Sequence, residues 1–130
     1  MNLGIIGCGA IGQKRARHLG EARLVHCVDV DPSRAAEVAT LSHGCVSGVD
    51  WRRLLDRADV DAVVIATPQE SQAEITRAAI TAGKHVLVEK PAARNVEELL
   101  DLPQLAAQHN VRVRVGFNHR YHREIGRAHV

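Results

Sequence analysis

The feature that most constrains the fold is a six-residue run, residues 7–12, with glycine at its first, third and last positions. The aliphatic residues 3–6 before it predict a short strand, and residues 10–19 predict a helix. In such a turn Gly7 permits a tight bend, Gly9 lets a ligand approach the backbone, and Gly12 lets the helix pack closely on the strand. The run therefore predicts a pyrophosphate site at a helix N-terminus, the alternative being a turn that only connects the two elements.

The rest of the chain alternates in the same way, with short aliphatic stretches separated by helical ones. Strands joined by helices form parallel sheets, because the crossovers are right-handed and cover both faces. We therefore predict an α/β fold, a doubly wound parallel sheet of six strands in the order 3-2-1-4-5-6, with helices on both faces. Its ligand crevice is expected beside strands one and four. The predicted strands are residues 3–6, 24–30, 45–46, 61–67, 84–89 and 111–116.

Helix boundaries are marked by local signals. Asp31 before Pro32 predicts the N-cap of a helix over 32–42, Asp50 predicts the cap of a short helix, and Gly83 predicts the end of a long one. The last helix is expected to start at Asn95, and Pro103 then falls inside it. A proline there predicts a kink or two shorter helices.

Composition excludes several classes of protein. The 130 residues fit one domain, and a net charge of +2 gives no general case for nucleic acid. No apolar stretch is long enough to span a bilayer. Cys8, Cys27 and Cys45 lack CxxC spacing, so neither a disulfide framework nor a zinc site is indicated, and a reducing cytoplasm is expected. His119 and His122 are three residues apart but have no third ligand nearby, so no metal is predicted.

An acidic residue follows the second predicted strand. Asp29 lies 22 residues after Gly7, the place where a carboxylate accepts hydrogen bonds from the hydroxyls of the adenosine ribose. A carboxylate there repels a 2′-phosphate, and Val30 supplies no cation to accept one. NAD is therefore predicted over NADP, and Arg34 is the residue that could reverse this preference. Asp31 is interpreted as a helix cap.

The ends of strands four and five carry further candidates. The Thr67 hydroxyl, fixed in its turn by Pro68, can reach a cofactor, although many α/β loops look like this. Lys90, held by Pro91, is expected to point toward the place where nicotinamide and substrate meet. Its ammonium could orient a substrate hydroxyl, lower the pKa of that hydroxyl or help move the proton that accompanies hydride transfer. The alternative for Lys90 is a solvated lysine at a strand end. Glu89 is expected either to form an ion pair with Lys90 or to hold the loop.

With these residues in place, the chain resembles the N-terminal, Rossmann-type domain of the glucose–fructose oxidoreductase / inositol dehydrogenase family, called Gfo/Idh/MocA. The resemblance covers residues 1 to about 121, and the Glu-Lys-Pro run in its setting is fairly specific. It rests on five segments, residues 7–12, 28–32, 61–68, 82–91 and 115–121.

The resemblance implies NAD(P)-dependent oxidation or reduction at a hydroxyl or carbonyl carbon, commonly of sugars or polyols. Lys90 takes the role of the active-site lysine, and Asn118 and Arg120 lie near the nicotinamide. Gln72 stands where the family often has histidine, which weakens a contact there. The predicted cofactor-binding residues are Gly7, Gly9, Ala10, Ile11, Gly12, Asp29, Arg34, Thr67, Pro68, Gln72, Glu89, Lys90 and Asn118.

The resemblance also predicts how the chain is organised. Residues 1–118 form the dinucleotide-binding domain, and residues 119–130 begin a connecting segment, with the second, substrate-binding domain absent. We therefore expect this chain to bind cofactor without full turnover. Its expected partners are a separate substrate domain or further copies of itself in a homo-oligomer. The alternative function is a non-catalytic dinucleotide-binding or redox-sensing module.

Overall fold

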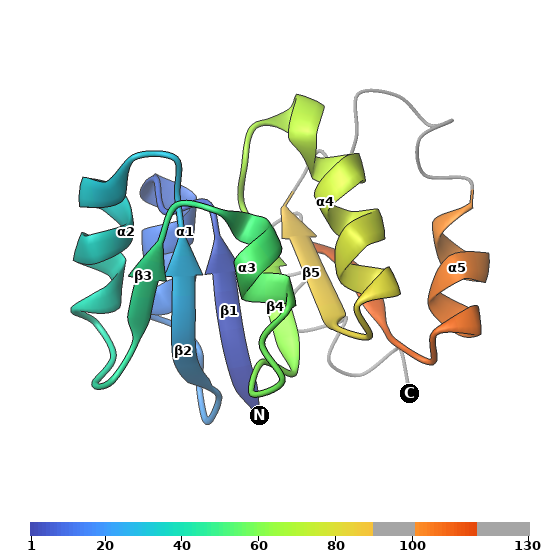
Figure 1. Ribbon diagram of the computed structural model, residues 1–130, viewed down its shortest axis with the longest axis horizontal. Helices are drawn as coiled ribbons and strands as arrows, with labels where there is room; N and C mark the ends of the chain where they lie inside the picture. Colours follow the sequence, from blue (N-terminus) through green and yellow to red (C-terminus); the bar gives the residue numbers. More distant parts are fainter. Residues whose placement is uncertain (90–100, 117–130) are drawn as a thin grey trace.

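A computed structural model describes residues 1–89 and 101–116 of the chain. Its six parallel strands form one sheet in the order β3-β2-β1-β4-β5-β6 (Figure 1), which confirms the predicted topology. The strands are β1 (Asn2–Ile6), β2 (Arg23–Val28), β3 (Val46–Gly48), β4 (Ala62–Ile65), β5 (His85–Glu89) and β6 (Val113–Gly116). The helices are α1 (Ala10–Ala16), α2 (Pro32–Ala39), α3 (Trp51–Leu55), α4 (Gln69–Thr81) and α5 (Leu102–Gln108).

Helices cover both faces of the sheet, as predicted, with α1 behind it and α3 in front in the view of Figure 1. Successive strand residues point to opposite faces, so neighbours in sequence join different cores. Ile5 packs with Leu24 and the α2 residue Val38 in one cluster. Ile6 packs with Val63 and residues of α3, α4 and α5 in the other.

The predicted helix signals act as expected. The Asp31 carboxylate accepts a hydrogen bond from Ser33 N at 2.9 Å, and the Asp50 carboxylate accepts one from Arg52 N at 3.0 Å. Gly83, just after α4, has a φ of +79°, the left-handed conformation that ends a helix.

Several element ends differ from the prediction. Helices α1 and α2 stop three residues early, at Ala16 and Ala39, because the chain turns before the predicted ends at 19 and 42. Strand β2 ends at Val28 rather than at 30: Asp29 N still donates to Gly48 O of β3 at 3.1 Å, and the Asp29 carboxylate then accepts from Asp31 N as the chain turns toward α2. Pro103 lies in the first turn of α5, where its missing N–H breaks no helical bond. The start predicted at Asn95 lies outside the described residues.

Candidate dinucleotide site

The glycine turn joins β1 to α1, and its geometry explains two of its three glycines. Gly7 has a φ of +99°, and a Cβ there would lie 2.6 Å from the carbonyl of Ala66. A Cβ on Gly12 would lie 2.0 Å from the Gly7 oxygen. A Cβ on Gly9, by contrast, would meet no atom within 4 Å. Gly7 and Gly12 are thus needed by the chain's own packing, whereas Gly9 faces open space.

The N-terminus of α1 has backbone donors to spare. No side chain caps it and no acidic residue lies in its first turn, whereas aspartates cap α2 and α3. The first bond of the helix runs from Gln13 N to Gly9 O at 2.9 Å. By helix geometry the N–H groups of Ala10, Ile11 and Gly12 therefore have no acceptor within the helix. Such donors, together with the helix dipole, suit a phosphate.

Asp29 connects the end of β2 to this turn. One carboxylate oxygen accepts a hydrogen bond from Cys8 N at 2.7 Å, and the other accepts one from Asp31 N at 2.8 Å. Each carboxylate oxygen can accept a further bond. The carboxylate is therefore held beside the turn with acceptor capacity left for two adjacent hydroxyls, such as those of a ribose.

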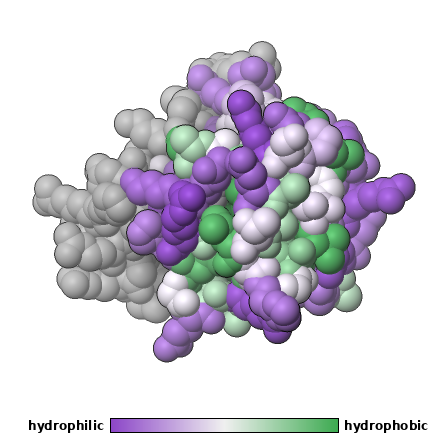
Figure 2. Space-filling view, turned by 90° about the vertical axis from the view of Figure 1, so that its left-hand side faces the viewer, coloured by the Kyte–Doolittle hydropathy of each residue, from purple (hydrophilic) through white to green (hydrophobic). Residues whose placement is uncertain are grey.

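Exposed apolar side chains lie at the same edge of the sheet. Val30 follows β2 and is 91% exposed, and Val49 follows β3 and is 53% exposed. Because Val28 pairs with Gly48, the two valines leave neighbouring strands at the same level. Exposed apolar side chains at the edge that carries Asp29 suit contact with a flat apolar ring. Figure 2 looks onto the α2 and β3 side of the molecule, where apolar patches lie among polar ones.

Sequence reasoning missed Val49. The only hint in the sequence is that an apolar residue stands directly before the cap residue Asp50.

The turn after β4 is braced from within. The Ser71 hydroxyl donates to Thr67 Oγ1 at 3.0 Å, and the Gln72 amide nitrogen donates to Thr67 O at 3.0 Å. Thr67 is half-buried and Pro68 is exposed, in the turn that follows β4 at the carboxyl edge of the sheet. Gln72 is only 2% exposed and lies beneath the turn rather than on its surface. A cofactor contact from Gln72 therefore stays a prediction that its burial weakens.

At the end of β5, Glu89 is paired with Arg15 of α1. The two side chains meet through two contacts, Arg15 Nε to Glu89 Oε2 and Arg15 Nη2 to Glu89 Oε1, the latter at 2.8 Å. Both carboxylate oxygens are thus engaged by α1, a partner that sequence reasoning missed. Lys90, Pro91, Asn118 and Arg120 lie outside the described residues. The remaining candidate, Arg34, is exposed, with Nε 3.8 Å from Asp31 Oδ2.

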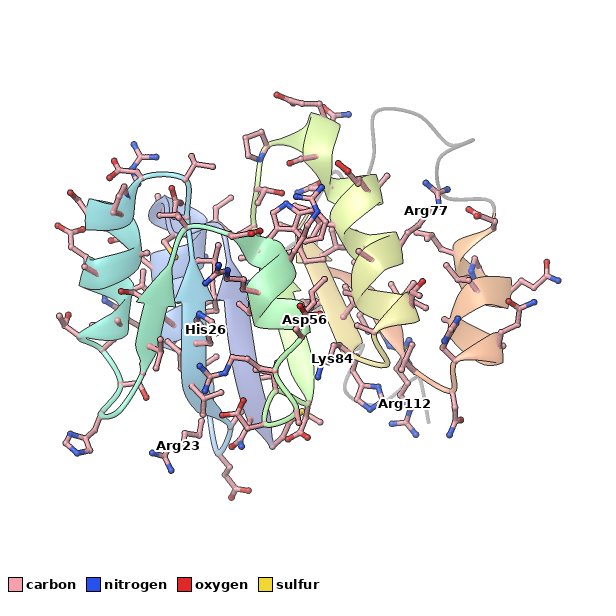
Figure 3. All side chains as sticks on the ribbon, viewed as in Figure 1. Arg23, His26, Asp56, Arg77, Lys84 and Arg112 are labelled. Atoms are coloured by element: carbon pink, nitrogen blue, oxygen red, sulfur yellow. The ribbon has the colours of Figure 1, made fainter. Side chains whose placement is uncertain are left out.

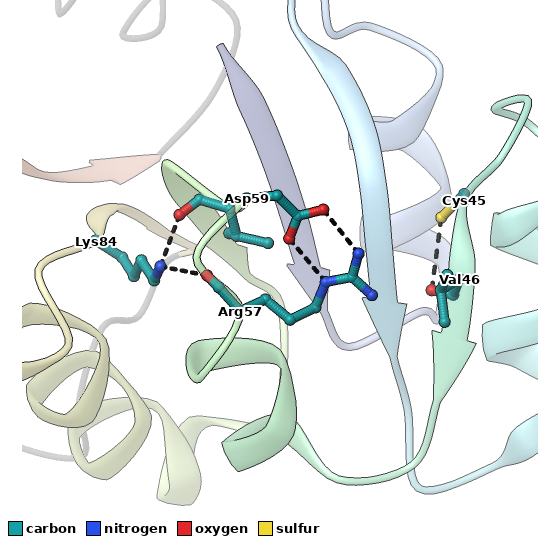
Figure 4. A network of polar contacts seen from close by, with 6 residues as sticks. Cys45, Val46, Arg57, Asp59 and Lys84 are labelled. Atoms are coloured by element: carbon teal, nitrogen blue, oxygen red, sulfur yellow. Dashed lines mark hydrogen bonds and ion pairs between the residues drawn. The ribbon is translucent and has the colours of Figure 1, made fainter.

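The opposite, amino edge of the sheet carries a polar network of another kind. Figure 3 shows Lys84 near this edge, and Figure 4 shows its contacts. Lys84 Nζ donates to Arg57 O at 2.6 Å and to Val60 O at 2.7 Å. The Arg57 guanidinium makes two bonds to Asp59, at 2.9 and 2.7 Å. These groups satisfy one another and leave little for a ligand.

Two kinds of feature are absent from residues 1–89 and 101–116. These residues contain no group of three or more histidine, cysteine or acidic side chains that could hold a metal ion. They also contain no helix that is long and apolar enough to cross a membrane.

Comparison with known proteins decides the family. Residues 1–117 match the family model described as an oxidoreductase family with an NAD-binding Rossmann fold, GFO_IDH_MocA. The chain belongs to the Gfo/Idh/MocA oxidoreductase family. The resemblance read from the glycine turn and the Glu-Lys-Pro run is thereby confirmed, and so is the NAD-binding Rossmann domain.

Relatives and solved structures agree with this assignment. The chain is 39% identical over 127 residues to inositol 2-dehydrogenase 2 of Saccharopolyspora erythraea, covering 93% of this chain and 37% of that protein. It resembles levoglucosan dehydrogenase in complex with NADH, with a TM-score of 0.83, 33% identity, and 92% and 35% of the two chains covered. It also resembles scyllo-inositol dehydrogenase from Lactobacillus casei with bound NAD(H) and scyllo-inositol, with a TM-score of 0.81, 28% identity, and 97% and 40% covered. The chain thus spans a little over a third of these proteins.

Proposed function

We propose that this chain is the cofactor-binding part of an oxidoreductase that moves a hydride between NAD and a hydroxyl or carbonyl carbon of a sugar, polyol or related small molecule. The observation that carries the proposal is the Asp29 carboxylate, bonded to Cys8 N at 2.7 Å and to Asp31 N at 2.8 Å. These bonds hold one acceptor for ribose hydroxyls next to free amides for phosphate. Among the relatives, enzymes named for inositol and levoglucosan support the substrate class.

The described residues supply binding and orientation. The amides of Ala10, Ile11 and Gly12 hold the pyrophosphate, and Asp29 orients the adenosine ribose. When bound, NAD supplies the hydride acceptor or donor. Lys90 has the role that the family resemblance gives it, holding the substrate oxygen and helping to move its proton.

Electrostatics support NAD over NADP. The Asp29 carboxylate, fixed by two backbone amides, lies where a 2′-phosphate would bring further negative charge. Arg34 is the nearest candidate cation in the following helix, and its guanidinium already lies 3.8 Å from the Asp31 carboxylate. We therefore propose that Arg34 does not offset the repulsion.

The second domain and the assembly of the chain concern residues and copies beyond those described. Because the family resemblance implies a second domain that carries the substrate pocket, we propose that this chain works together with such a domain, and that it forms homo-oligomers. A reducing cytoplasm suits the three free cysteines, two of which are fully buried. Sedimentation that shows a clean monomer at protein concentrations of tens of micromolar would contradict self-association.

A redox-sensing module has less support. The sulfurs of Cys27 and Cys45 lie 3.8 Å apart. The contact with Cys45 lowers the pKa of Cys27, but its hydrogen bond with Cys8 and its burial outweigh this and raise the pKa to about 12. The pKa of Cys45 is also raised, by the contact with Cys27 and by burial. Thiols that stay protonated react slowly with oxidants.

Calorimetric titration with NAD, NADH and NADP tests the cofactor proposal. The wild-type chain should bind NAD and NADH more tightly than NADP. Asp29→Ala should weaken NAD binding and narrow the preference over NADP, because it removes both the ribose acceptor and the repelling charge. Gly9→Val should abolish binding, since its side chain would fill the space above the turn. Absence of binding by both wild type and Gly9→Val would refute the proposal.

A further inference from the structure

The ion pair between Arg15 and Glu89 joins two segments 74 residues apart in sequence. The Arg15 side chain is 15% exposed and the Glu89 side chain 7% exposed, so the pair is largely withdrawn from water. Just beneath it, Leu87 of β5 and Ala16 of α1 pack against the same hydrophobic cluster. Arg15 thus joins α1, which packs on β1 and β4, to the end of β5.

Stability alone is a weak reason for a buried pair of this kind. The cost of removing two charges from water roughly cancels their attraction, so well-packed apolar replacements are often no less stable. What a bidentate arginine–carboxylate pair adds is geometry, because two parallel bonds fix both the separation and the orientation of the groups. Here the pair fixes the end of β5 relative to α1.

The ends of this connection lie at the two halves of the proposed dinucleotide site. Asp29 places the adenosine ribose beside β2, and the amides of α1 hold the pyrophosphate. Across the sheet order β2-β1-β4-β5, the nicotinamide half must then lie toward β4 and β5. Glu89 is the last residue of β5, pairs in register with Gly116 of β6, and is followed in the chain by Lys90.

We propose that Arg15 and Glu89 are positioning residues that align the nicotinamide side of the site with the pyrophosphate helix. The proposal rests on the function proposed above. Neither side chain needs to touch the cofactor. The pair fixes the end of β5, and Glu89 pairs in register with Gly116 of β6, so both strand ends are held relative to the helix that binds the pyrophosphate. Glu89 therefore holds the end of β5 through α1. The two roles predicted for it, an ion pair with Lys90 and a hold on the following loop, involve residues outside the described ranges.

Two ligands separate this role from a purely structural one. ADP-ribose contains the adenosine, the pyrophosphate and the second ribose, but it lacks the nicotinamide, whereas NADH contains all four. The variants are Glu89→Gln, which keeps the shape of the side chain, and Arg15→Lys, which keeps the charge but loses the two-pronged geometry. Arg77→Lys is the matched control, since Arg77 pairs with Asp101 between α4 and α5, away from the turn.

Calorimetry should show that Glu89→Gln and Arg15→Lys bind ADP-ribose within about twofold of wild type and NADH about tenfold more weakly, where tenfold corresponds to about 1.4 kcal/mol. The fluorescence emission of bound NADH should move toward that of free NADH in these two variants. Arg77→Lys should bind both ligands as wild type does. Thermal unfolding of each variant establishes that it is folded at the titration temperature.

The outcomes distinguish the two proposals. If wild type binds neither ligand, the proposed function fails and this inference falls with it. If wild type binds both, and folded Glu89→Gln and Arg15→Lys lose affinity for neither or for both equally, the positioning role alone is wrong. A loss of NADH affinity without a loss of ADP-ribose affinity supports the positioning role.

Discussion

The two edges of the same sheet use their polar groups in opposite ways. At the amino edge, Lys84 donates to two backbone carbonyls, and the Asp61 carboxylate accepts from Asn2 N at 2.8 Å. At the carboxyl edge, α1 lacks a capping side chain, and a Cβ on Gly9 would stand in open space. The first edge completes its hydrogen bonds internally, whereas the second keeps donors for a ligand.

This difference separates residues that stabilise the fold from residues that bind the cofactor. Polar groups that satisfy one another contribute to folding and tolerate little change. Donors left over at a helix N-terminus contribute little to folding and can bind an anion. Substitutions at the two edges should therefore have separable effects on stability and on affinity.

The largest separation is expected within the glycine turn itself. Gly12→Ala places a Cβ 2.0 Å from the Gly7 oxygen and should lower the free energy of unfolding by about 3 kcal/mol or more. Gly9→Ala meets no atom within 4 Å and has an ordinary extended φ of −75°. It should cost less than about 1 kcal/mol of stability, yet weaken NAD binding at least about tenfold. Urea unfolding measures stability and calorimetry measures NAD affinity. Equal stability losses for both variants would contradict the separation between residues that stabilise the fold and residues that bind the cofactor.

The amino edge should show the reverse pattern. Lys84→Met leaves the buried Val60 carbonyl without its lysine donor, whereas the Arg57 carbonyl still accepts from Val60 N at 3.3 Å. The substitution should lower stability by about 1–3 kcal/mol. The NAD affinity of the folded protein should stay within about twofold of wild type, a difference of well under 1 kcal/mol. Lys14→Met is the matched control, because Lys14 is exposed and its change should leave stability nearly intact. A tenfold loss of NAD affinity in Lys84→Met would show that the two edges are coupled.

Local sequence signals predicted most of the fold. The caps Asp31 and Asp50 and the stop at Gly83 act within a few residues of their position, and strands alternating with helices specified the sheet order. The strand limits were predicted less well, because β2 ends at Val28 rather than at 30, and the Asp29 carboxylate that follows it bonds Cys8 N and Asp31 N. The contact with Cys8 N joins residues 21 apart and has no local signature.

The candidate site was predicted in its backbone and missed in its supporting contacts. Glycine spacing located the turn, and Asp29 was found by its distance from it. The partner of Glu89, the burial of Gln72 and the exposure of Val49 depend on how separate elements pack together. A single sequence records such packing only indirectly, so these features required the structure.

The smallest expected effect concerns His26 at the buried side of β2. It is 7% exposed, Gly48 lies against its ring, and its Nδ1 has no hydrogen-bond partner among the described residues. Burial lowers the pKa of His26 below 6.5, and the charge of Arg57 lowers it further, against an opposite effect of Asp59. The unfolded chain therefore binds this proton more readily than the folded protein.

It follows that stability should fall as the pH drops below 6.5, through the range down to the lowered pKa of the folded protein. His26→Leu removes this titration, so its unfolding free energy should change less between pH 7 and about pH 5 than that of wild type. The pKa values of Asp59 and Asp101 are also lowered, by their bonds to Arg57 and Arg77, so these two carboxylates change stability mainly at pH values below this window. His18→Leu, the same replacement at an exposed position, serves as the control. Equal slopes for wild type and His26→Leu would mean that His26 takes up its proton as easily in the fold as in water.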